Sequence, residues 1–343
     1  MAKTNRKWVL RSRPEGMPGR DDFELREEPV PPIGDGQFLV RTLYLSCDPA
    51  QRAWMSRDTY VPMIPIGDVM HSGATGQVFE SKHAGFREGD LVSGMFGWQD
   101  YAVSDGRGFM SVTKLPPAVA IPTAMSALGV TGLTAYFGML DVGNPQAGDG
   151  VLVSGAAGAT GSIAAQIAKI RGARVVGIAG GAEKCAWLTG ELGLDAAIDY
   201  RAERVARRIH ELLPKGCNVY FDNVGGEILD AALGALAIGA RVVLCGAISS
   251  YNETELPPGP RNYTNLIVRR ARMEGFLVTD YAARFGEAIA DLARWAGEGK
   301  LRDRVDVVDG LENAPDALRR LFSGENLGKQ LVRVAEPSSA RGA

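Results

Sequence analysis

The sequence of 343 residues contains only four cysteines, and no two of them form a C-x-x-C motif. Cys47, Cys185, Cys217 and Cys245 stand far apart. Their spacing argues against a zinc knuckle and against a disulfide framework. This use of cysteine is typical of the reducing cytoplasm, where we expect the protein to act.

The chain also lacks an excess of basic residues and an apolar amino terminus. Lysine and arginine number 38 against 40 acidic residues, so the net charge is -2. This balance argues against a nucleic-acid partner. The first residues, "MAKTNRKWVLRSRPEG", contain no apolar run, so we predict no secretory signal.

One long uncharged run, residues 115–140, resembles a membrane span in length. Pro122, several glycines and many Ser and Thr residues dilute its hydrophobicity, and no basic cluster flanks it. We therefore predict no membrane partner. The run is instead expected to form a buried helix that joins two domains.

The length of the chain and a change of pattern along it predict two domains in an α/β protein. In the first third, short β-type runs alternate with turns rich in Gly and Pro, which favours a small, largely antiparallel barrel. From Asp149 onward, six strand-like runs alternate with helix-like runs. This alternation predicts a doubly wound parallel sheet with helices on both faces. The last residues return to β character and are expected to complete the first domain.

A glycine-rich turn, "SGAAGATG", follows the first predicted strand of the second domain. Ala156, Gly158 and Gly161 fit the three positions of a G-x-G-x-x-G pattern. A glycine at the second position lets the backbone approach a pyrophosphate, and one at the third lets the helix lie close to the strand. The alternative is a tight strand-to-helix turn that binds no ligand.

The second strand, "RVVGIAG", lacks the acidic residue that NAD-binding proteins place at its end to bind the ribose hydroxyls. Ala179, Gly180 and Gly181 stand there instead, and Lys184 follows in the next helix. Without the carboxylate nothing repels a 2′-phosphate, the two glycines leave room and exposed amides, and Lys184 can reach the phosphate. We therefore predict NADP(H) as the cofactor, although Lys184 could also be an ordinary solvated helix residue.

Several longer motifs now identify a family. They are "SGAAGATGSIAAQIAKIRGARVVGIAGGAEKC", "LGLDAAIDY", "VYFDNVGGEILD", "VVLCGAISSYN", "NLGKQLV", "YLSCDPAQRAWM" and "HSGATGQV". Together they resemble the medium-chain dehydrogenase/reductase superfamily, in its zinc-free branch of prostaglandin, alkenal and curcumin reductases. The resemblance covers nearly the whole chain.

The resemblance implies the domain plan, the reaction and the assembly. It implies a GroES-like β-barrel catalytic domain over residues 1–125, completed by 302–343, and a Rossmann NADP-binding domain over 126–301. It further implies that NADPH reduces the carbon–carbon double bond of a small α,β-unsaturated ketone or aldehyde. A homodimer is usual for this resemblance.

The resemblance also assigns cofactor-binding residues to seven stretches of the chain. The pyrophosphate turn would be Gly158, Ala159, Thr160 and Gly161; Lys184 and Tyr200 would hold the 2′-phosphate; Asn223 would face the ribose; Cys245, Gly246, Ala247, Ile248, Ser249, Ser250 and Tyr251 would run along the nicotinamide half; Phe276, Leu277 and Val278 would offer backbone to the carboxamide; and Asn326 would close the site. Phe276 and Val278 could instead be core residues, and Asn326 a turn residue.

The sequence departs from the zinc-dependent relatives of this superfamily. Cys47 lies near the position of their first ligand, but no Glu follows His71 and the four-cysteine lobe is missing. We therefore predict no metal. Many members of the zinc-free branch have a Tyr after "DP", where this chain has Ala50 and Gln51, so the shape of the substrate pocket is left open.

Tyr251 is the predicted catalytic residue. Hydride addition to the β-carbon of an enone builds negative charge on the carbonyl oxygen, which needs a hydrogen-bond donor. Tyr251 follows the fifth predicted strand, at the end where doubly wound folds bind ligands. Candidates for an apolar pocket wall are Trp54, Tyr60, Met63 and Trp98.

Three alternatives to this reading stay open. Tyr251 could be an ordinary loop residue. The enzyme could reduce quinones with the same fold and cofactor. The protein could also bind NADPH without catalysis.

Overall fold

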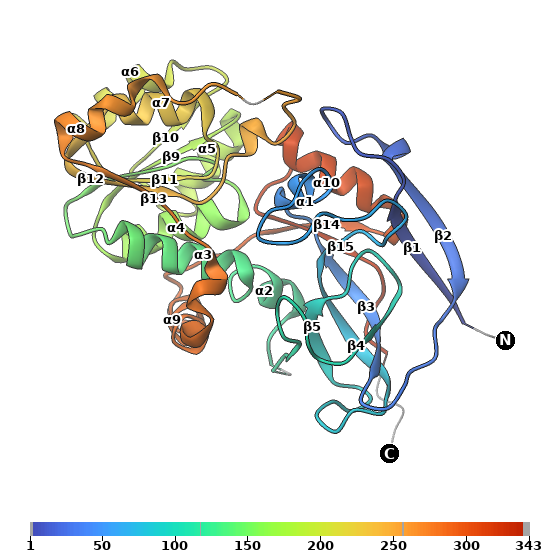
Figure 1. Cartoon of the computed structure of the whole chain (residues 1–343). Coiled ribbons are helices and arrows are strands. Elements are labelled where there is room, and N and C mark those ends of the chain that lie inside the picture. Colours follow the sequence, from blue (N-terminus) through green and yellow to red (C-terminus); the bar gives the residue numbers. More distant parts are fainter. Residues whose placement is uncertain (1–2, 117, 256, 339–343) are drawn as a thin grey trace. The chain divides into compact units, whose positions relative to one another are not determined.

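The computed structural model describes residues 3–116, 118–255 and 257–338. The chain forms two compact units (Figure 1). The first consists of the chain up to Met125, Val305–Asn326 and the residues from Gln330 onward; the second consists of Ser126–Arg304 and Leu327–Lys329.

The first unit is rich in antiparallel β-structure. Its larger sheet has the strand order β14 (Val305–Asp309), β15 (Lys329–Arg333), β3 (Phe38–Ser46), β4 (Gly73–Ser81), β5 (Leu91–Met95) and β7 (Thr113–Lys114), with β6 (Tyr101–Ser104) paired to β3. A separate pair is formed by β1 (Thr4–Leu10) and β2 (Phe23–Pro29). The helices of this unit are α1 (Ala50–Trp54), α2 (Ile121–Met125) and α10 (Ala314–Ser323). Strand β3 pairs antiparallel with β4, β6 and β15, as the alternating pattern of this region predicts.

The second unit contains a parallel sheet with the Rossmann order. Its strands lie in the order β10 (Ala196–Asp199), β9 (Arg174–Ala179), β8 (Gly150–Val153), β11 (Cys217–Asp222), β12 (Leu236–Leu244) and β13 (Arg272–Gly275). Every adjacent pair is parallel. Counted along the chain, the order is 3-2-1-4-5-6, which is that of dinucleotide-binding folds. The predicted fold class is confirmed.

Burial on both faces explains why these strands are nearly continuous apolar runs. Alternate residues of one strand face opposite cores: Val151 and Val153 lie in one cluster and Leu152 in the other, all fully buried. The first core includes residues of α3 (Val130–Phe137), α4 (Ala159–Ile170), α5 (Ala182–Gly190) and α9 (Phe285–Gly297). The second includes residues of α6 (Val205–Leu212) and α7 (Gly226–Gly234), with α8 (Asn265–Arg269) beside them.

The uncharged run forms two short helices, so the prediction of one joining helix was wrong. Helix α2 ends at Met125, and α3 begins at Val130. Between them the carbonyl oxygen of Ser126 accepts hydrogen bonds from the amides of Gly129 and Gly132. A Cβ on Gly132 would lie 1.8 Å from the Ala127 oxygen, so the chain bends here around a glycine. Among the described residues, no helix has the length and apolar character to cross a membrane.

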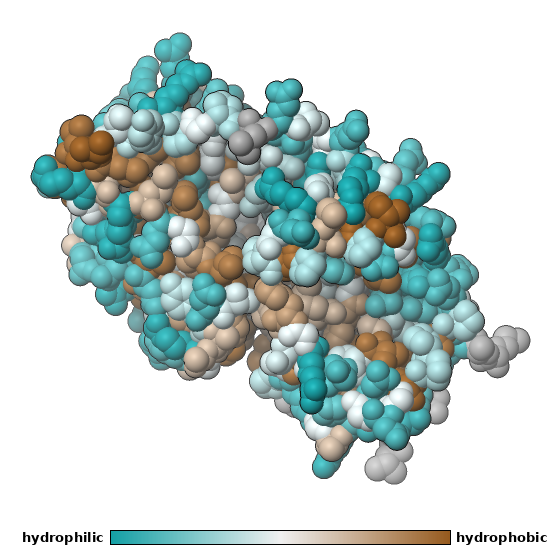
Figure 2. Space-filling view, in the orientation of Figure 1, coloured by the Kyte–Doolittle hydropathy of each residue, from teal (hydrophilic) through white to brown (hydrophobic). Residues whose placement is uncertain are grey.

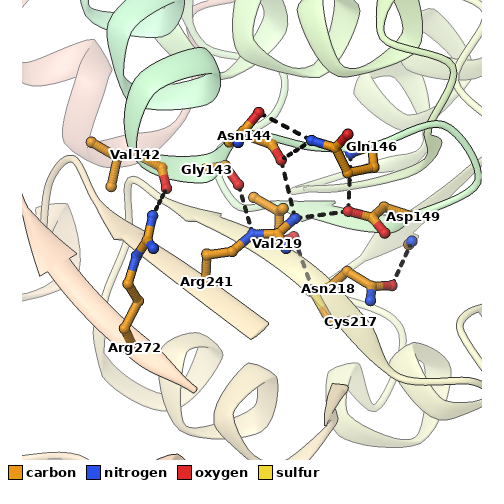
Figure 3. Close-up of polar contacts among 11 residues, drawn as sticks. Val142, Gly143, Asn144, Gln146, Asp149, Cys217, Asn218, Val219, Arg241 and Arg272 are labelled. Carbon is orange, nitrogen blue, oxygen red and sulfur yellow. Dashed lines mark hydrogen bonds and ion pairs between the residues drawn. The ribbon is translucent and has the colours of Figure 1, made fainter. Parts of the chain in front are cut away.

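A polar network stabilises the amino-terminal edge of the parallel sheet (Figure 3). A π-helix over Gly138–Gly143 follows α3 and ends at Asn144, which adopts a left-handed conformation with φ 42°. Arg241 of β12 donates to the Gly143 oxygen at 2.8 Å and forms an ion pair with Asp149 at 2.7 Å. Arg272 of β13 donates to the Val142 oxygen at 2.7 Å. The two guanidinium groups therefore satisfy carbonyls that a helix leaves open at its carboxyl end.

Candidate functional site

The predicted site residues of the second unit follow the carboxyl ends of six different strands. Gly158 follows β8, Lys184 follows β9 and Tyr200 follows β10, while Asn223, Cys245 and Phe276 follow β11, β12 and β13. Since these strands are parallel, their carboxyl ends lie along one edge of the sheet. The strand order reverses between β8 and β11, which is where such folds bind ligands.

The glycine turn has the close geometry that its sequence predicts. Gly155 has φ +57°, and Gly158 is the N-cap of α4. A Cβ on Gly161 would lie 2.3 Å from the Gly155 oxygen, so only glycine fits there. The first amides of α4, those of Ala159, Thr160 and Gly161, have no acceptor within the helix and carry the positive end of its dipole. This turn can bind a phosphate.

A segment distant in the sequence pairs with the same turn. Gly328 donates its amide to the Ala157 oxygen at 2.9 Å and forms a parallel bridge with Gly158. Gly328 has φ +78°, and a Cβ there would lie 2.0 Å from the Arg304 oxygen. Asn326, a predicted site residue, lies two positions before Gly328. It is buried, but it belongs to the first unit.

The turn after β9 lies against the residues that follow β10. A Cβ on Gly180 would come within 2.9 Å of both the Tyr200 ring and the Arg201 Nε. Gly181, with φ +99°, has no atom within 4 Å of the space a Cβ would take. Lys184 is half-buried in the first turn of α5. The structure therefore brings together the turn, Tyr200 and the helix that carries Lys184.

The expectation of exposed glycine amides at this turn was wrong for Gly181. Its amide donates to the Asp199 Oδ1 at 2.9 Å, and the amide of Arg201 donates to the same oxygen at 3.0 Å. The hydrogen bond from Gly181 is the main cause that lowers the pKa of Asp199 below its usual range. A carboxylate is therefore present near the turn, but it comes from the end of the next strand and two backbone amides bind it.

Asp222 is a functional candidate that the sequence reasoning did not identify. Its fully buried Oδ1 accepts hydrogen bonds from the Ser154 hydroxyl at 2.8 Å and from the Tyr220 hydroxyl at 2.7 Å. The same oxygen accepts the amides of Val224 and Gly225, both at 3.0 Å. Burial, followed by the charge of Asp222, raises the pKa of Tyr220 well above its usual value. The only available signal was an acid at the end of a buried strand, in "VYFDNVGG".

Hydrogen bonds to Ser154 fix Asn223 at the point where the strand order reverses, between β8 and β11. Its side-chain amide donates to the backbone carbonyl oxygen of Ser154 at 2.6 Å, and its backbone amide donates to the Ser154 hydroxyl at 2.9 Å. The predicted ribose-facing residue is thus held against the end of β8, close to the glycine turn.

The loop that carries Tyr251 packs on the loop after β11. The backbone amides of Cys245 and Gly246 donate to the backbone carbonyl oxygen of Asp222 at 2.9 and 3.0 Å. The Ser249 hydroxyl donates to the carbonyl oxygen of Val224. Tyr251 ends a short 3₁₀ helix (Ile248–Ser250), and its hydroxyl accepts the Ala247 amide at 3.2 Å.

The residues after β13 present different faces. Phe276 and Val278 pack against the first core, as the alternative reading of their side chains states, whereas Leu277 is 37% exposed. A Cβ on Gly138 would lie 2.5 Å from the Phe276 ring, so the ring fills the space beside this glycine.

In the first unit, the side chains predicted to line an apolar pocket differ in how far they are exposed to solvent. Trp98 is fully buried and packs against Phe23, so it cannot line a pocket. Tyr60 is 45% exposed and lies between the rings of Trp54 and Phe109.

Over the described residues, no group of three or more His, Cys, Asp or Glu side chains could hold a metal ion. Burial lowers the pKa of His71, and Cys47 is buried.

Two family profiles match most of the chain. Residues 6–112 match the family described as "N-terminal domain of oxidoreductase". Residues 159–294 match the family described as "Zinc-binding dehydrogenase".

Individual relatives match over nearly their full length. The chain is 43% identical to the NADPH-dependent curcumin reductase of Escherichia coli, over 96% of this chain and 97% of that protein. It is 38% identical to prostaglandin reductase 1 of Rattus norvegicus, over 95% and 98%. A crystal structure of CurA from Vibrio vulnificus in complex with NADPH matches with a TM-score of 0.92 and 42% identity, over 97% of this chain and all of that one.

Proposed function

The chain belongs to the medium-chain dehydrogenase/reductase superfamily, in its branch of prostaglandin, alkenal and curcumin reductases, and on that basis we propose its reaction. It is an NADP(H)-dependent oxidoreductase. The proposed reaction is reduction of the carbon–carbon double bond of an α,β-unsaturated ketone or aldehyde, with hydride transfer to the β-carbon.

One observation supports this proposal above the others. The loops after β8, β11 and β12 are bound to one another at the point where the strand order reverses. The edge thus combines a helix N-terminus, suited to a pyrophosphate, with a tyrosine loop a short distance along the same edge. These residues fit a dinucleotide such as NADPH, which supplies a hydride when bound.

The residues of this edge take separate roles in the proposal. The amides of Ala159, Thr160 and Gly161 bind the pyrophosphate, and Lys184 and Tyr200 bind the 2′-phosphate. Asn223, held by Ser154, and the loop 245–251 line the ribose and nicotinamide half. The backbone of Phe276, Leu277 and Val278 binds the carboxamide.

Tyr251 is the proposed donor to the carbonyl oxygen of the substrate. As the hydride reaches the β-carbon, negative charge accumulates on that oxygen, so a donor there stabilises the transition state more than the ground state. The Ala247 amide fixes the phenol oxygen as an acceptor. In this proposal, Tyr251 donates its phenol hydrogen to the substrate oxygen.

Replacing the hydroxyl tests this role. Tyr251→Phe keeps the ring, and we expect the turnover number with a simple enone to fall by about ten- to a thousandfold. The affinity for NADPH should stay close to that of the wild type, as measured by fluorescence titration. Tyr263→Phe, at an exposed tyrosine of the same unit, is the matched control and should leave both quantities unchanged.

The same assay distinguishes the alternatives. Wild-type turnover of enones by Tyr251→Phe would contradict the donor role. Oxidation of NADPH with a quinone but not with an enone would favour quinone reduction. Tight NADPH binding without oxidation by either substrate would favour a binding protein.

A further inference from the structure

Arg201 is a cationic residue that lies against the glycine turn after β9. A Cβ on Gly180 would lie 2.9 Å from the Arg201 Nε. The same Cβ would also contact the Tyr200 ring. The centre of the Arg201 guanidinium lies 5.9 Å from the centroid of that ring. Arg201 therefore extends from the end of β10 back to the turn that lacks an acid.

The backbone fixes Arg201 in this position. The amides of Arg201 and Gly181 share the Asp199 Oδ1 as acceptor, at 3.0 and 2.9 Å. One carboxylate thus joins the loop after β10 to the turn after β9. Because Asp199 binds both loops, the backbone of Arg201 is fixed beside the turn that contains Gly180.

The acidic groups around Arg201 have other partners. Asp199 accepts backbone amides, and its own amide donates to the Glu203 Oε2 at 2.9 Å. The other oxygen of Glu203 forms an ion pair with Arg208 at 2.6 Å. Lys184 lies beside the acidic Glu183 in the first turn of α5, so cationic side chains come to this turn from two elements, Arg201 after β10 and Lys184 in α5.

We propose that Arg201 binds the phosphate on the adenosine ribose and thereby selects NADP(H) over NAD(H). The inference rests on the proposed cofactor site and adds a residue to it. A guanidinium is planar and offers paired donors that fit a phosphate monoester, unlike a lysine ammonium. Some NADP-binding Rossmann folds accommodate this phosphate with an arginine near the turn, and here the arginine comes from the end of the next strand, β10.

Calorimetric titration with 2′,5′-ADP and with 5′-AMP tests this inference without the reaction. The two probes differ only in the phosphate that Arg201 is proposed to bind. We expect Arg201→Ala to weaken binding of 2′,5′-ADP by roughly ten- to a hundredfold. Binding of 5′-AMP should change less than twofold, and Arg201→Lys should recover part of the loss.

The matched control is Arg204→Ala, which removes another exposed arginine three positions away. It should leave both affinities within twofold of the wild type, with thermal unfolding as the check on folding. Equal losses for both probes, or no loss with 2′,5′-ADP, would overturn the proposal. Failure to reduce enones while Arg201 still discriminates between the probes would contradict the proposed reaction alone.

Discussion

At the scale of single residues, Asp222 connects the loops of the candidate site. Its Oδ1 accepts four hydrogen bonds, from two hydroxyls and two amides. Its carbonyl oxygen accepts two more amides from the loop that leads to Tyr251. Its Oδ2 is buried and has no hydrogen-bond partner within the described part of the chain. A buried carboxylate is costly unless it is well bonded, so this charge depends on the Oδ1 contacts.

Asp222→Asn should therefore lower stability while keeping the shape of the side chain. Without the charge, the four hydrogen bonds at Oδ1 weaken, and we expect the free energy of unfolding to fall by about 1–3 kcal/mol. Urea denaturation measures this change. The exposed Asp35→Asn should change it by less than about 0.5 kcal/mol. Equal stability of Asp222→Asn and the wild type would contradict a role for the charge.

At the scale of elements, the start of α4 depends on one glycine. Gly161 lets the helix approach the turn, and a Cβ there would meet backbone, which cannot move aside as a flexible side chain can. Eight consecutive residues of the helix are buried, so it is enclosed on all sides and cannot shift without loss of packing. The amides that we propose for the pyrophosphate are fixed by this packing.

Gly161→Ala should reduce both stability and cofactor affinity. Forcing a methyl group into this contact should cost about 1–3 kcal/mol of unfolding free energy. Displacement of the first turn should weaken NADPH binding at least about tenfold, measured by calorimetry. Gly190→Ala, in α5 with no atom within 4 Å of the added carbon, should be neutral or stabilising by up to about 1 kcal/mol. Similar behaviour of the two variants would show that close packing at Gly161 is not required.

At the scale of the whole molecule, the edge of the parallel sheet suits a second copy of the chain. Among the described strands, β13 has β12 as its one neighbour. Beside it, Ile267 and Val268 of α8 are 77% and 64% exposed, and Figure 2 shows an apolar patch there. Antiparallel pairing of two β13 strands about Met273 would place Arg272 opposite Glu274 of the other copy. An exposed edge of this kind is otherwise a site of uncontrolled association.

We therefore propose that the chain forms a homodimer through β13 and α8. The double substitution Ile267→Glu and Val268→Glu should convert the dimer to a monomer, as measured by sedimentation velocity. Ile289→Glu, at an exposed position on α9, should leave the dimer intact. Glu274→Arg should weaken the dimer through like charges, and adding Arg272→Glu should restore it. A wild-type monomer at micromolar concentration would refute the proposal.

Independence from zinc is a further prediction for the whole enzyme. Prolonged chelation should leave NADPH-dependent activity unchanged, because the proposed mechanism needs no metal. Elemental analysis should find less than one zinc per chain. Loss of activity on chelation, followed by recovery with zinc, would place the enzyme with the zinc-dependent relatives.

Sequence reasoning predicted the second unit better than the connection that leads into it. All six strands of the parallel sheet lie where apolar runs and glycine turns predict them. Helix α7 ends at Gly234 although apolar residues continue to Ile238, because Leu236 and the residues after it pair with β11. Apolar residues alone do not distinguish a buried helix from a buried strand, so the sheet decided this boundary.

The sequence by itself determined the strand series, the glycine turn and the missing acid, because each depends on neighbouring residues. A strand or a helix start needs only local periodicity, and a close backbone approach needs only a glycine at one position. The tertiary structure decided which groups meet across loops: Asp199 with the Gly181 amide, Arg201 with Gly180, and Asp222 with Ser154. These pairs lie 18 to 68 residues apart, and the order of the strands in the sheet, not the local sequence, brings them together.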